Sequence, residues 1–231
     1  MGFAGLAGRC DPGDVPEVSP PSPRIAIVDY GAGNLRSVEK ALVRSGIDAR
    51  VCGDPDEVAR ADGVVLPGAG AFREAIRNLE ARGLADAVRE SVAAGRPYLG
   101  LCLGLQLLFD EGDEHGVTPG LGILPGRVER FPKSTPDGKP LLVPHIGWNR
   151  VRFEGDHPML ESLPDEDAFY FVHSFHAVPA DPALTVGTTE YGARFTSAAA
   201  RDNVFAVQFH PEKSQRAGKR LLDAFARWAS A

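Results

Sequence analysis

The strongest candidate for a reactive group in this 231-residue sequence is a cysteine between glycines. Residues 98–109 read YLGLCLGLQLLF, in which one apolar run leads into GLCLG at 100–104 and a second apolar run follows. This is a G-x-nucleophile-x-G pattern, which holds a nucleophile on a sharp turn between a strand and a helix. The small glycines let the backbone turn tightly and let a substrate approach. The pattern predicts a nucleophilic Cys102, with an apolar helix after it whose N-terminus favours the thiolate. A buried core cysteine is the plain alternative.

A histidine and a glutamate lie two residues apart in VFAVQFHPEKS, residues 204–214. Since only Pro211 separates His210 from Glu212, we expect an extended backbone that directs both side chains to one face. A carboxylate that fixes the tautomer of a histidine makes it a base for a nucleophile. Alone, the pair also fits an ordinary surface histidine near a glutamate. Because both motifs end apolar strands, and parallel strands share their carboxyl edge, we expect His210 to meet Cys102.

A glycine-rich turn is predicted after a third apolar strand, in LPGAGAF at 66–72. Gly68, Ala69 and Gly70 could direct backbone N–H groups into the space above Cys102. An oxyanion hole requires donors of this kind. A plain connection between a strand and a helix would have the same composition.

The elements that must position these groups follow two patterns. In the first half, apolar strands are predicted at 24–30, 48–53, 63–70 and 97–102, with helical spacing at 35–46 and 71–94. This alternation indicates a mostly parallel sheet with right-handed crossovers. From Gly126 onward, strands follow one another at 126–131, 141–153, 168–178, 184–192 and 203–210, before an amphipathic helix at 216–229. We therefore expect an α/β fold whose C-terminal half adds antiparallel strands to the parallel core.

Length and composition bound the domain organisation. With 43% hydrophobic and 24% charged residues, the chain suits one globular domain. Residues 1–23 are rich in Pro and Gly and lack both the basic start and the apolar stretch of a secretory signal. We expect a flexible leader at 1–23 and a single domain at 24–231.

Several classes of partner and cofactor are disfavoured. The formal net charge of −6 offers no general field for nucleic acid, and no apolar run approaches the length of a membrane-spanning helix. The three cysteines, Cys10, Cys52 and Cys102, cannot all pair and have no zinc-ligand spacing, so a reducing cytoplasm is expected.

No cofactor or metal is expected either. A dinucleotide fingerprint begun at Gly31 and Gly33 would need a third glycine at Arg36. The histidines outside the HPE motif lack ligand spacing and are interpreted as structural: His145, His157, His173 and His176.

Taken together, PGAG, GLCLGLQLLF and HPEKS resemble the class I (triad) glutamine amidotransferases. Within that class the chain is most similar to the glutaminase subunits of imidazole glycerol phosphate synthase, from histidine biosynthesis. The narrower resemblance depends on DYGAGNLRSV at 29–38, PHIGWN at 144–149 and FYFVHSF at 169–175. It covers the chain from about Arg24 onward. Leu105 and Ile146 stand where methionine is expected, an apolar replacement that leaves the chemistry unchanged.

The resemblance implies a set of site residues. Cys102 would attack the glutamine side-chain amide, His210 would transfer the proton and Glu212 would orient His210, so that ammonia and then glutamate are released. The oxyanion would be held by the backbone at Gly68, Ala69, Gly70 and Leu103. Glutamine would be bound by Gln106, Glu114 and the backbone of His173, Ser174 and Phe175.

The resemblance also implies a partner. In that family ammonia passes to a (β/α)8-barrel cyclase subunit, with which the glutaminase forms a heterodimer. The products are imidazole glycerol phosphate and aminoimidazole carboxamide ribotide. Residues that match the docking face are Asn34, Pro144, Ile146, Trp148, Asn149, Tyr170 and Lys213.

Three other functions fit parts of the sequence. A glutaminase could serve another synthase, such as one for anthranilate or pyridoxal phosphate, but GAGNLRSV and PHIGWN argue against this. A non-catalytic amidotransferase-like domain would be expected to lack Cys102, His210 or Glu212. A stand-alone cysteine hydrolase or peptidase is disfavoured by Gln106, which suits an amino-acid substrate, and by the surface that PHIGWN offers to a partner.

Overall fold

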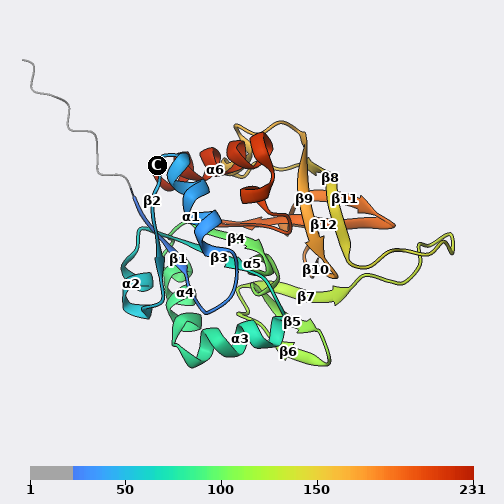
Figure 1. Cartoon of the computed structure of the whole chain (residues 1–231), viewed down its shortest axis with the longest axis horizontal. Helices are drawn as coiled ribbons and strands as arrows, with labels where there is room; N and C mark the ends of the chain where they lie inside the picture. Colours follow the sequence, from blue (N-terminus) through green and yellow to red (C-terminus); the bar gives the residue numbers. More distant parts are fainter. Residues whose placement is uncertain (1–22) are drawn as a thin grey trace, which may run out of the picture.

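A thirteen-stranded sheet runs through residues 23–231, the part of the chain that this computed structural model describes (Figure 1). The leader expected at 1–23 lies outside these residues except for Pro23. The N-terminal half of the sheet is parallel and the C-terminal half is largely antiparallel, as the sequence predicts.

The parallel half has the order β2-β1-β3-β4-β13. Its strands are β1 (Arg24–Val28), β2 (Asp48–Cys52), β3 (Gly63–Gly68), β4 (Tyr98–Cys102) and β13 (Val204–Val207). Continuous apolar runs form β1, β3, β4 and β13 because both faces of these strands are covered. The last strand of the chain, β13, pairs parallel to β4, which brings the two chemical motifs to neighbouring strand ends.

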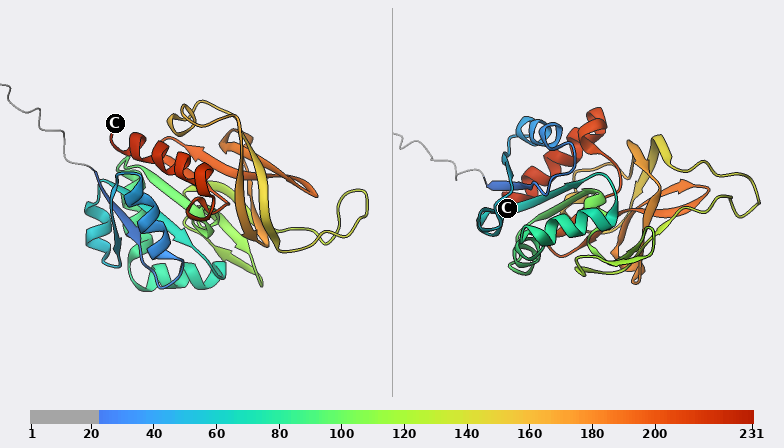
Figure 2. Two further views of the ribbon diagram at one scale, coloured as in Figure 1. Left: turned by 45° about the horizontal axis from the view of Figure 1, so that its top comes forward. Right: turned by 60° about the horizontal axis from the view of Figure 1, so that its bottom comes forward.

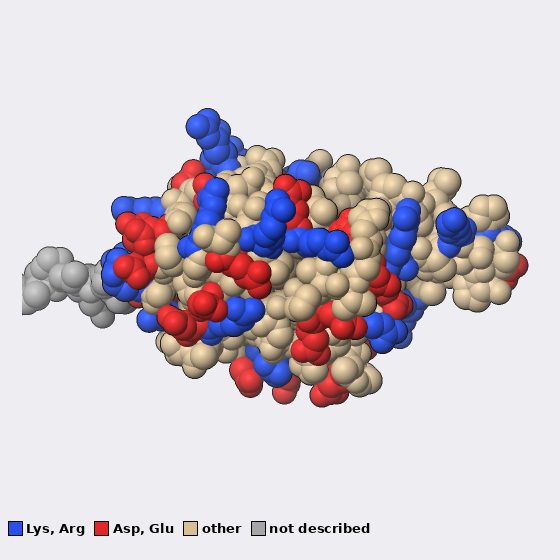
Figure 3. Space-filling view, turned by 90° about the horizontal axis from the view of Figure 1, so that it is seen from below, with Lys and Arg blue, Asp and Glu red and all other residues tan. Residues whose placement is uncertain are grey.

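Helices cover both faces of the parallel strands. The helices α1 (Leu35–Arg44) and α6 (Gln215–Ala229) lie side by side on one face, while α2 (Pro55–Arg60), α3 (Phe72–Ala81) and α4 (Leu84–Ala93) cover the other (Figure 2). None of the helices in residues 23–231 is long and apolar enough to span a membrane. On the face drawn in Figure 3, acidic and basic side chains are interspersed.

The antiparallel half continues the sheet beyond β13. The main path runs through β12 (Ala193–Arg201), β10 (Phe175–Pro179), β7 (Leu124–Arg130), β5 (Phe109–Asp113) and β6 (Val117–Pro119). Three further strands pair with β12 and with one another: β11 (Thr185–Tyr191), β8 (His145–Phe153) and β9 (Glu166–His173). Short 3-10 turns occupy Pro158–Leu160, Pro182–Leu184 and Pro211–Lys213.

Some boundaries differ from the sequence prediction. The helix expected at 71–94 is two helices, because Gly83 adopts a left-handed φ of 69° between them. The helix α2 was not predicted, although Asp54 caps it with bonds from the amides of Asp56 and Glu57 and Pro55 occupies its first position. The strand β12 was also missed, since its alanine-rich sequence lacks a strand period.

The apolar helix expected after Cys102 is wrong in length. The helix α5 spans only Leu103–Gln106. Leu107 caps this helix, and from Phe109 the chain forms β5, which pairs with β7. Because Leu107, Leu108 and Phe109 are all buried, the sequence alone could not separate a helix from a buried turn and strand.

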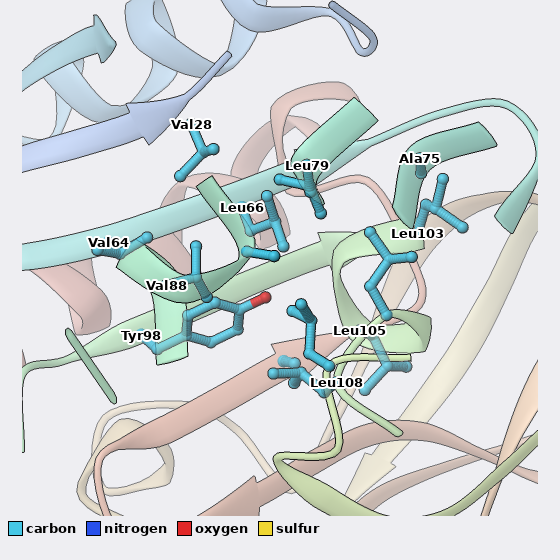
Figure 4. Close-up of a cluster of buried hydrophobic side chains, with 14 of the residues drawn as sticks. Val28, Val64, Leu66, Ala75, Leu79, Val88, Tyr98, Leu103, Leu105 and Leu108 are labelled. Atoms are coloured by element: carbon cyan, nitrogen blue, oxygen red, sulfur yellow. The ribbon is translucent and has the colours of Figure 1, made fainter. Parts of the chain in front are cut away.

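The core beneath α3 and α4 supports the turn that carries Cys102. Leu103 and Leu105 of α5 pack into the same cluster as Leu66 of β3 and Tyr98 of β4 (Figure 4). Full burial of an apolar side chain of this size stabilises the fold by about 1.5–3 kcal/mol. The turn is therefore held by packing on the side away from solvent.

Candidate active site

The turn between β4 and α5 is sharp and strained. Cys102 has φ 55° and ψ −104°, a conformation that non-glycine residues rarely adopt. The hydroxyl of Tyr98 donates a 2.9 Å hydrogen bond to the carbonyl of Gly104 and closes the turn from below. Any Cβ at Gly104 would collide with the carbonyl of Leu66. These constraints place Cys102 on a tight turn at the carboxyl end of the strand, as a nucleophile elbow requires.

The glycine turn that was predicted to supply oxyanion donors lies directly beside the elbow. Gly68 is the last residue of β3 and is the register partner of Cys102 on β4. A Cβ at Gly68 would lie only 2.6 Å from the Cβ of Leu103, so only glycine fits there. Gly70 has φ 101°, which also favours glycine. The backbone amides that follow β3 and β4 therefore lie at the same edge of the sheet.

His210 meets Cys102 at this edge. It follows β13, in which Val207 is the register partner of Leu101 on β4. The Cys102 side chain acts on His210 at close range and is one of the groups that raise the pKa of that histidine. The His210 Nδ1 donates to Oε1 of Glu212 at 2.9 Å, which leaves Nε2 for the sulfur. The structure thus brings together all three residues that the two motifs single out.

The extended backbone expected between His210 and Glu212 is wrong. Pro211–Lys213 forms a 3-10 turn instead. Proline suits the first position of such a turn because its φ is fixed and it has no N–H to satisfy. The Ser214 hydroxyl donates to the His210 carbonyl at 2.6 Å and holds the turn closed. Glu212 reaches His210 by folding back within the turn.

The electrostatics of this pair favour a protonated imidazole. Burial by itself would lower the pKa of His210, but its hydrogen bonds to Cys102 and Glu212 and the charges of both groups outweigh burial and raise the pKa to about 9. The Glu212 side chain is only 3% exposed, so its charge acts at short range on His210. A protonated His210 beside the negatively charged Cys102 sulfur can donate a proton to a leaving amine.

The residues expected to bind glutamine flank the elbow on two sides. Gln106 donates from Nε2 to the carbonyl of Phe175 at 2.9 Å, so it lies against the 173–175 segment. Glu114 lies on the other side, where its Oε2 accepts a 2.7 Å hydrogen bond from the amide of Phe72 at the start of α3. A hollow of about 420 Å³ adjoins this carboxylate and is lined by Ala71, Arg73, Glu74, Arg77, Glu114 and His115.

Two buried residues near Cys102 were missed by sequence reasoning. The Gln208 side chain is fully buried and donates from Nε2 to the Cys102 sulfur at 3.6 Å. Its signal was a polar residue inside the apolar run VFAVQFH. Tyr30 is also fully buried, and its hydroxyl lies 2.7 Å from where a Cβ at Gly68 would stand. Its burial and the nearby charge of Cys102 raise the pKa of Tyr30.

The residues expected at a docking face lie mostly on the antiparallel pair β8 and β9. Trp148 and Tyr170 are register partners whose ring centroids are 6.3 Å apart, and the Lys213 Nζ lies 5.9 Å from the Tyr170 ring. Ile146 and Trp148 are 59% and 51% exposed. With Pro144 and Val172 they form the β8–β9 surface. The Asn149 side chain lies on the other face of β8, where it donates to the carbonyl of Glu190 at 3.0 Å, so its expected place on the docking face is wrong. Asn34 is exposed directly before α1.

The remaining histidines are engaged in hydrogen bonds. The His145 Nδ1 lies 3.0 Å from Nε2 of His173, whose Nδ1 lies 2.8 Å from the Phe175 carbonyl. Burial lowers the pKa of His145 to about 4 and that of His173 to about 3. Within residues 23–231 no three or more His, Cys, Asp or Glu side chains gather as metal ligands.

Known proteins share both this sequence and this fold. Residues 26–228 match the family described as glutamine amidotransferase class-I. The chain is 52% identical over 210 residues to "Imidazole glycerol phosphate synthase subunit HisH" of Aromatoleum aromaticum, covering 89% of this chain and 98% of the relative. The relative of the same name from Geobacillus thermodenitrificans is 50% identical, with 87% and 94% covered.

Solved structures agree at the level of the fold. The structure titled "Structure of PurLQS from Thermotoga maritima" superposes with a TM-score of 0.70 at 17% identity, covering 90% of this chain and 99% of the other. The glutaminase domain of CTPS from Trypanosoma brucei gives a TM-score of 0.64 at 15% identity, with 90% and 93% covered. On its sequence matches, this chain belongs to the class-I glutamine amidotransferases, and among them to the family of imidazole glycerol phosphate synthase subunits HisH.

Proposed function

We propose that this chain hydrolyses glutamine to glutamate and ammonia through Cys102, His210 and Glu212. The observation that carries the proposal is that Cys102 and His210 lie at the ends of the neighbouring parallel strands β4 and β13, with His210 hydrogen-bonded to Glu212 and influenced by Cys102. A cysteine nucleophile, a histidine and an orienting carboxylate are the parts of a nucleophilic triad.

The steps of the reaction follow from the proton that His210 carries. The Cys102 sulfur, whose proton is already held by His210, attacks the carboxamide carbon of glutamine as a thiolate, and the carbonyl oxygen gains negative charge. His210 gives its proton to the nitrogen, the C–N bond breaks, and ammonia leaves a glutamyl thioester. His210, now neutral, takes a proton from water as the water oxygen attacks the thioester. The C–S bond then breaks, and glutamate and the free cysteine are released.

The glycine turn and the flanking polar groups fit the other needs of this reaction. We assign the oxyanion to the backbone at Gly68, Ala69, Gly70 and Leu103, since this backbone adjoins the sulfur. Glu114 offers a carboxylate to the substrate ammonium group. The Nε2 of Gln106 is engaged by Phe175 and Gln208, so its Oε1 is the atom left to bind substrate.

We further propose that the ammonia passes to a (β/α)8-barrel cyclase subunit bound as a heterodimer. The relatives are named as subunits of imidazole glycerol phosphate synthase, which supports a partner of this kind. The β8–β9 surface, together with Asn34 and Lys213, supports the place of docking, because exposed Trp and Ile side chains are typical of interface anchors. The products would be imidazole glycerol phosphate and aminoimidazole carboxamide ribotide.

We also propose that residues 24–231 act as a single catalytic domain. The strand β13 supports this, since it returns from the C-terminal half to complete the parallel sheet of the N-terminal half. A catalytic thiol must stay reduced, and the described cysteines Cys52 and Cys102 are both free. A reducing compartment such as the cytoplasm suits both facts.

Release of glutamate from glutamine tests the function. The purified chain is assayed alone, with the cyclase subunit, and with the cyclase subunit plus its nucleotide ligand. We expect slow turnover alone and strong stimulation by both additions, because partner binding would set the oxyanion donors of the turn at 68–70. Turnover without stimulation would point to a different acceptor enzyme. No turnover in any arm would favour a non-catalytic domain.

A further inference from the structure

A buried side-chain amide contacts the sulfur of Cys102. The Nε2 of Gln208 lies 3.6 Å from the sulfur, and the Gln208 residue has no exposed surface. Gln208 follows β13 directly and stands two residues before His210. The same segment therefore presents two side chains to the nucleophile.

The orientation of the Gln208 amide is determined by its neighbours. The carbonyl of Phe175 can only accept hydrogen bonds, so the group of Gln106 that lies 2.9 Å from it must be Nε2. The second N–H of that Nε2 points to Gln208 at 3.1 Å, and only the oxygen of Gln208 can accept it. The end of Gln208 that faces Cys102 is consequently its N–H donor.

The Phe175 carbonyl at the base of this row is itself held. It accepts from His173 Nδ1 at 2.8 Å as well as from Gln106, so both of its lone pairs are engaged. The amide of Gln208 is also attached through its backbone, which donates a 2.9 Å bond to the carbonyl of Ser197 on β12. Neither Gln106 nor Gln208 can turn its amide over without leaving buried groups unpaired.

The chemistry of the donor favours charge on the sulfur. A thiol is a weak acceptor, whereas a hydrogen bond to an ionised group is about twice as strong as one between neutral groups. A fully buried N–H without an adequate acceptor destabilises the protein. A polar side chain that served packing alone would not need to turn its donor end toward Cys102.

We propose that Gln208 is an additional catalytic residue, whose N–H holds the Cys102 sulfur in place and stabilises its negative charge. This rests on the proposed function, in which the sulfur is negative before it attacks glutamine and again when the thioester breaks. Gln208 would thus act on the sulfur at both ends of the reaction, while the glycine turn acts on the substrate oxygen.

The test uses two variants of the full chain, each combined with the cyclase subunit. Gln208→Met keeps the volume but has no N–H. Gln208→Glu also removes the N–H that faces Cys102 but keeps an oxygen that accepts from Gln106. An effect shared by both variants is therefore due to the lost N–H and not to a lost hydrogen bond with Gln106. Gln215→Glu is the matched control, because it makes the same chemical change at an exposed position just beyond the HPE turn.

Two readouts are taken. The first is the rate of alkylation of Cys102 by chloroacetamide between pH 5 and 10, followed by mass spectrometry of the Cys102 peptide. The second is kcat and KM for glutamine. We expect both Gln208 variants to need a higher pH for half-maximal alkylation and to lose about tenfold to a hundredfold in kcat, whereas Gln215→Glu keeps the wild-type values.

The outcomes separate this inference from the proposed function. Wild-type alkylation profiles and kcat in both Gln208 variants would overturn the inference while leaving glutamine hydrolysis intact. The wild type could also release no glutamate while the Gln208 variants still shift the pH profile of Cys102 alkylation. That result would overturn the proposed function but support the contact between Gln208 and the sulfur. If Gln208→Glu shows no thermal unfolding transition and so is not folded, the results for Gln208→Met alone test the inference. If Gln208→Met unfolds as well, the amide serves folding and the inference fails.

Discussion

The backbone N–H of His210 donates a 2.9 Å hydrogen bond to the carbonyl of Tyr170. Ser214 strengthens the connection, since its hydroxyl accepts from the amide of Tyr170 at 3.0 Å and donates to the carbonyl of His210. The strand that carries half of the β8–β9 surface is thereby attached to the histidine of the proposed triad. A partner bound at Tyr170 would act on His210 through the backbone.

Removing the Ser214 hydroxyl tests this attachment. Ser214→Ala should lower the free energy of unfolding by about 1–3 kcal/mol, because the part-buried amide of Tyr170 and the carbonyl of His210 each lose a hydrogen-bond partner. Stimulation of glutaminase activity by the partner should fall more than the activity of the isolated chain. Denaturant unfolding and glutamate release with and without the cyclase subunit measure the two effects. Equal losses in both activity assays would mean that Ser214 only stabilises the turn.

Replacing the nucleophile should separate the two halves of the proposed reaction. Cys102→Ser is expected to abolish glutamine-dependent synthesis by the complex and to leave ammonia-dependent synthesis near wild type. The reason is that only the source of ammonia is lost. The measurement is the formation of imidazole glycerol phosphate from added glutamine or from ammonium salt. Loss of both activities to the same extent would contradict the division of labour between the subunits.

The pKa of His210 sets an alkaline limit to activity. As pH rises through about 9, His210 loses the proton that the leaving ammonia needs, so kcat should fall. Glu212→Gln removes one of the charges that raise this pKa and should move the fall to lower pH. Rate profiles from pH 6 to 10 measure both. A Glu212→Gln profile that coincides with wild type would contradict this assignment.

The same pKa has a consequence for stability. A histidine whose pKa is higher in the folded than in the unfolded chain stabilises the fold fully below the unfolded value of about 6.5. That contribution should be lost as pH rises from there through about 9. The melting temperature of wild type should therefore decline over this interval more than that of Cys102→Ala, in which one cause of the raised pKa is absent.

The architecture of this site was largely predictable, while its supporting contacts were not. Gly68 and Cys102 end apolar strands and His210 follows one, so their meeting at one sheet edge follows from the parallel order of those strands. Gln208 was not predicted, because a polar residue among apolar neighbours does not reveal which atom it contacts. The turn at Pro211 was missed because short 3-10 turns have no period to detect. The amide orientation of Gln106 depends on a carbonyl 69 residues away.

The buried pair His145 and His173 predicts an acid limit to stability. Burial lowers both pKa values, to about 4 and about 3, so the unfolded chain binds more protons than the folded chain below about pH 6.5. Stability should therefore be lost as pH falls from 6.5 toward 4, by on the order of several kcal/mol. His145→Gln removes one titrating group. The free energy of unfolding of this variant should be lower than that of wild type at pH 8 but should fall less steeply as the pH is lowered. If its dependence on pH equals that of wild type, His145 is not a source of the acid limit.

Trp148 is expected to be an anchor for the partner. Its side chain is half exposed on the β8–β9 surface, so Trp148→Ala should leave the melting temperature of the isolated chain within a few degrees of wild type. Truncation of a central tryptophan at an interface commonly costs about 2 kcal/mol or more, which corresponds to a roughly thirtyfold higher Kd. Leu142→Ala is the matched control, because Leu142 is 80% exposed on the segment between β7 and β8 that projects from the sheet (Figure 1). Calorimetric titration with the cyclase subunit distinguishes the two positions. If the two variants bind the cyclase subunit equally tightly, the docking face is not on β8 and β9. A loss of affinity in Trp148→Ala alone would support docking at these strands.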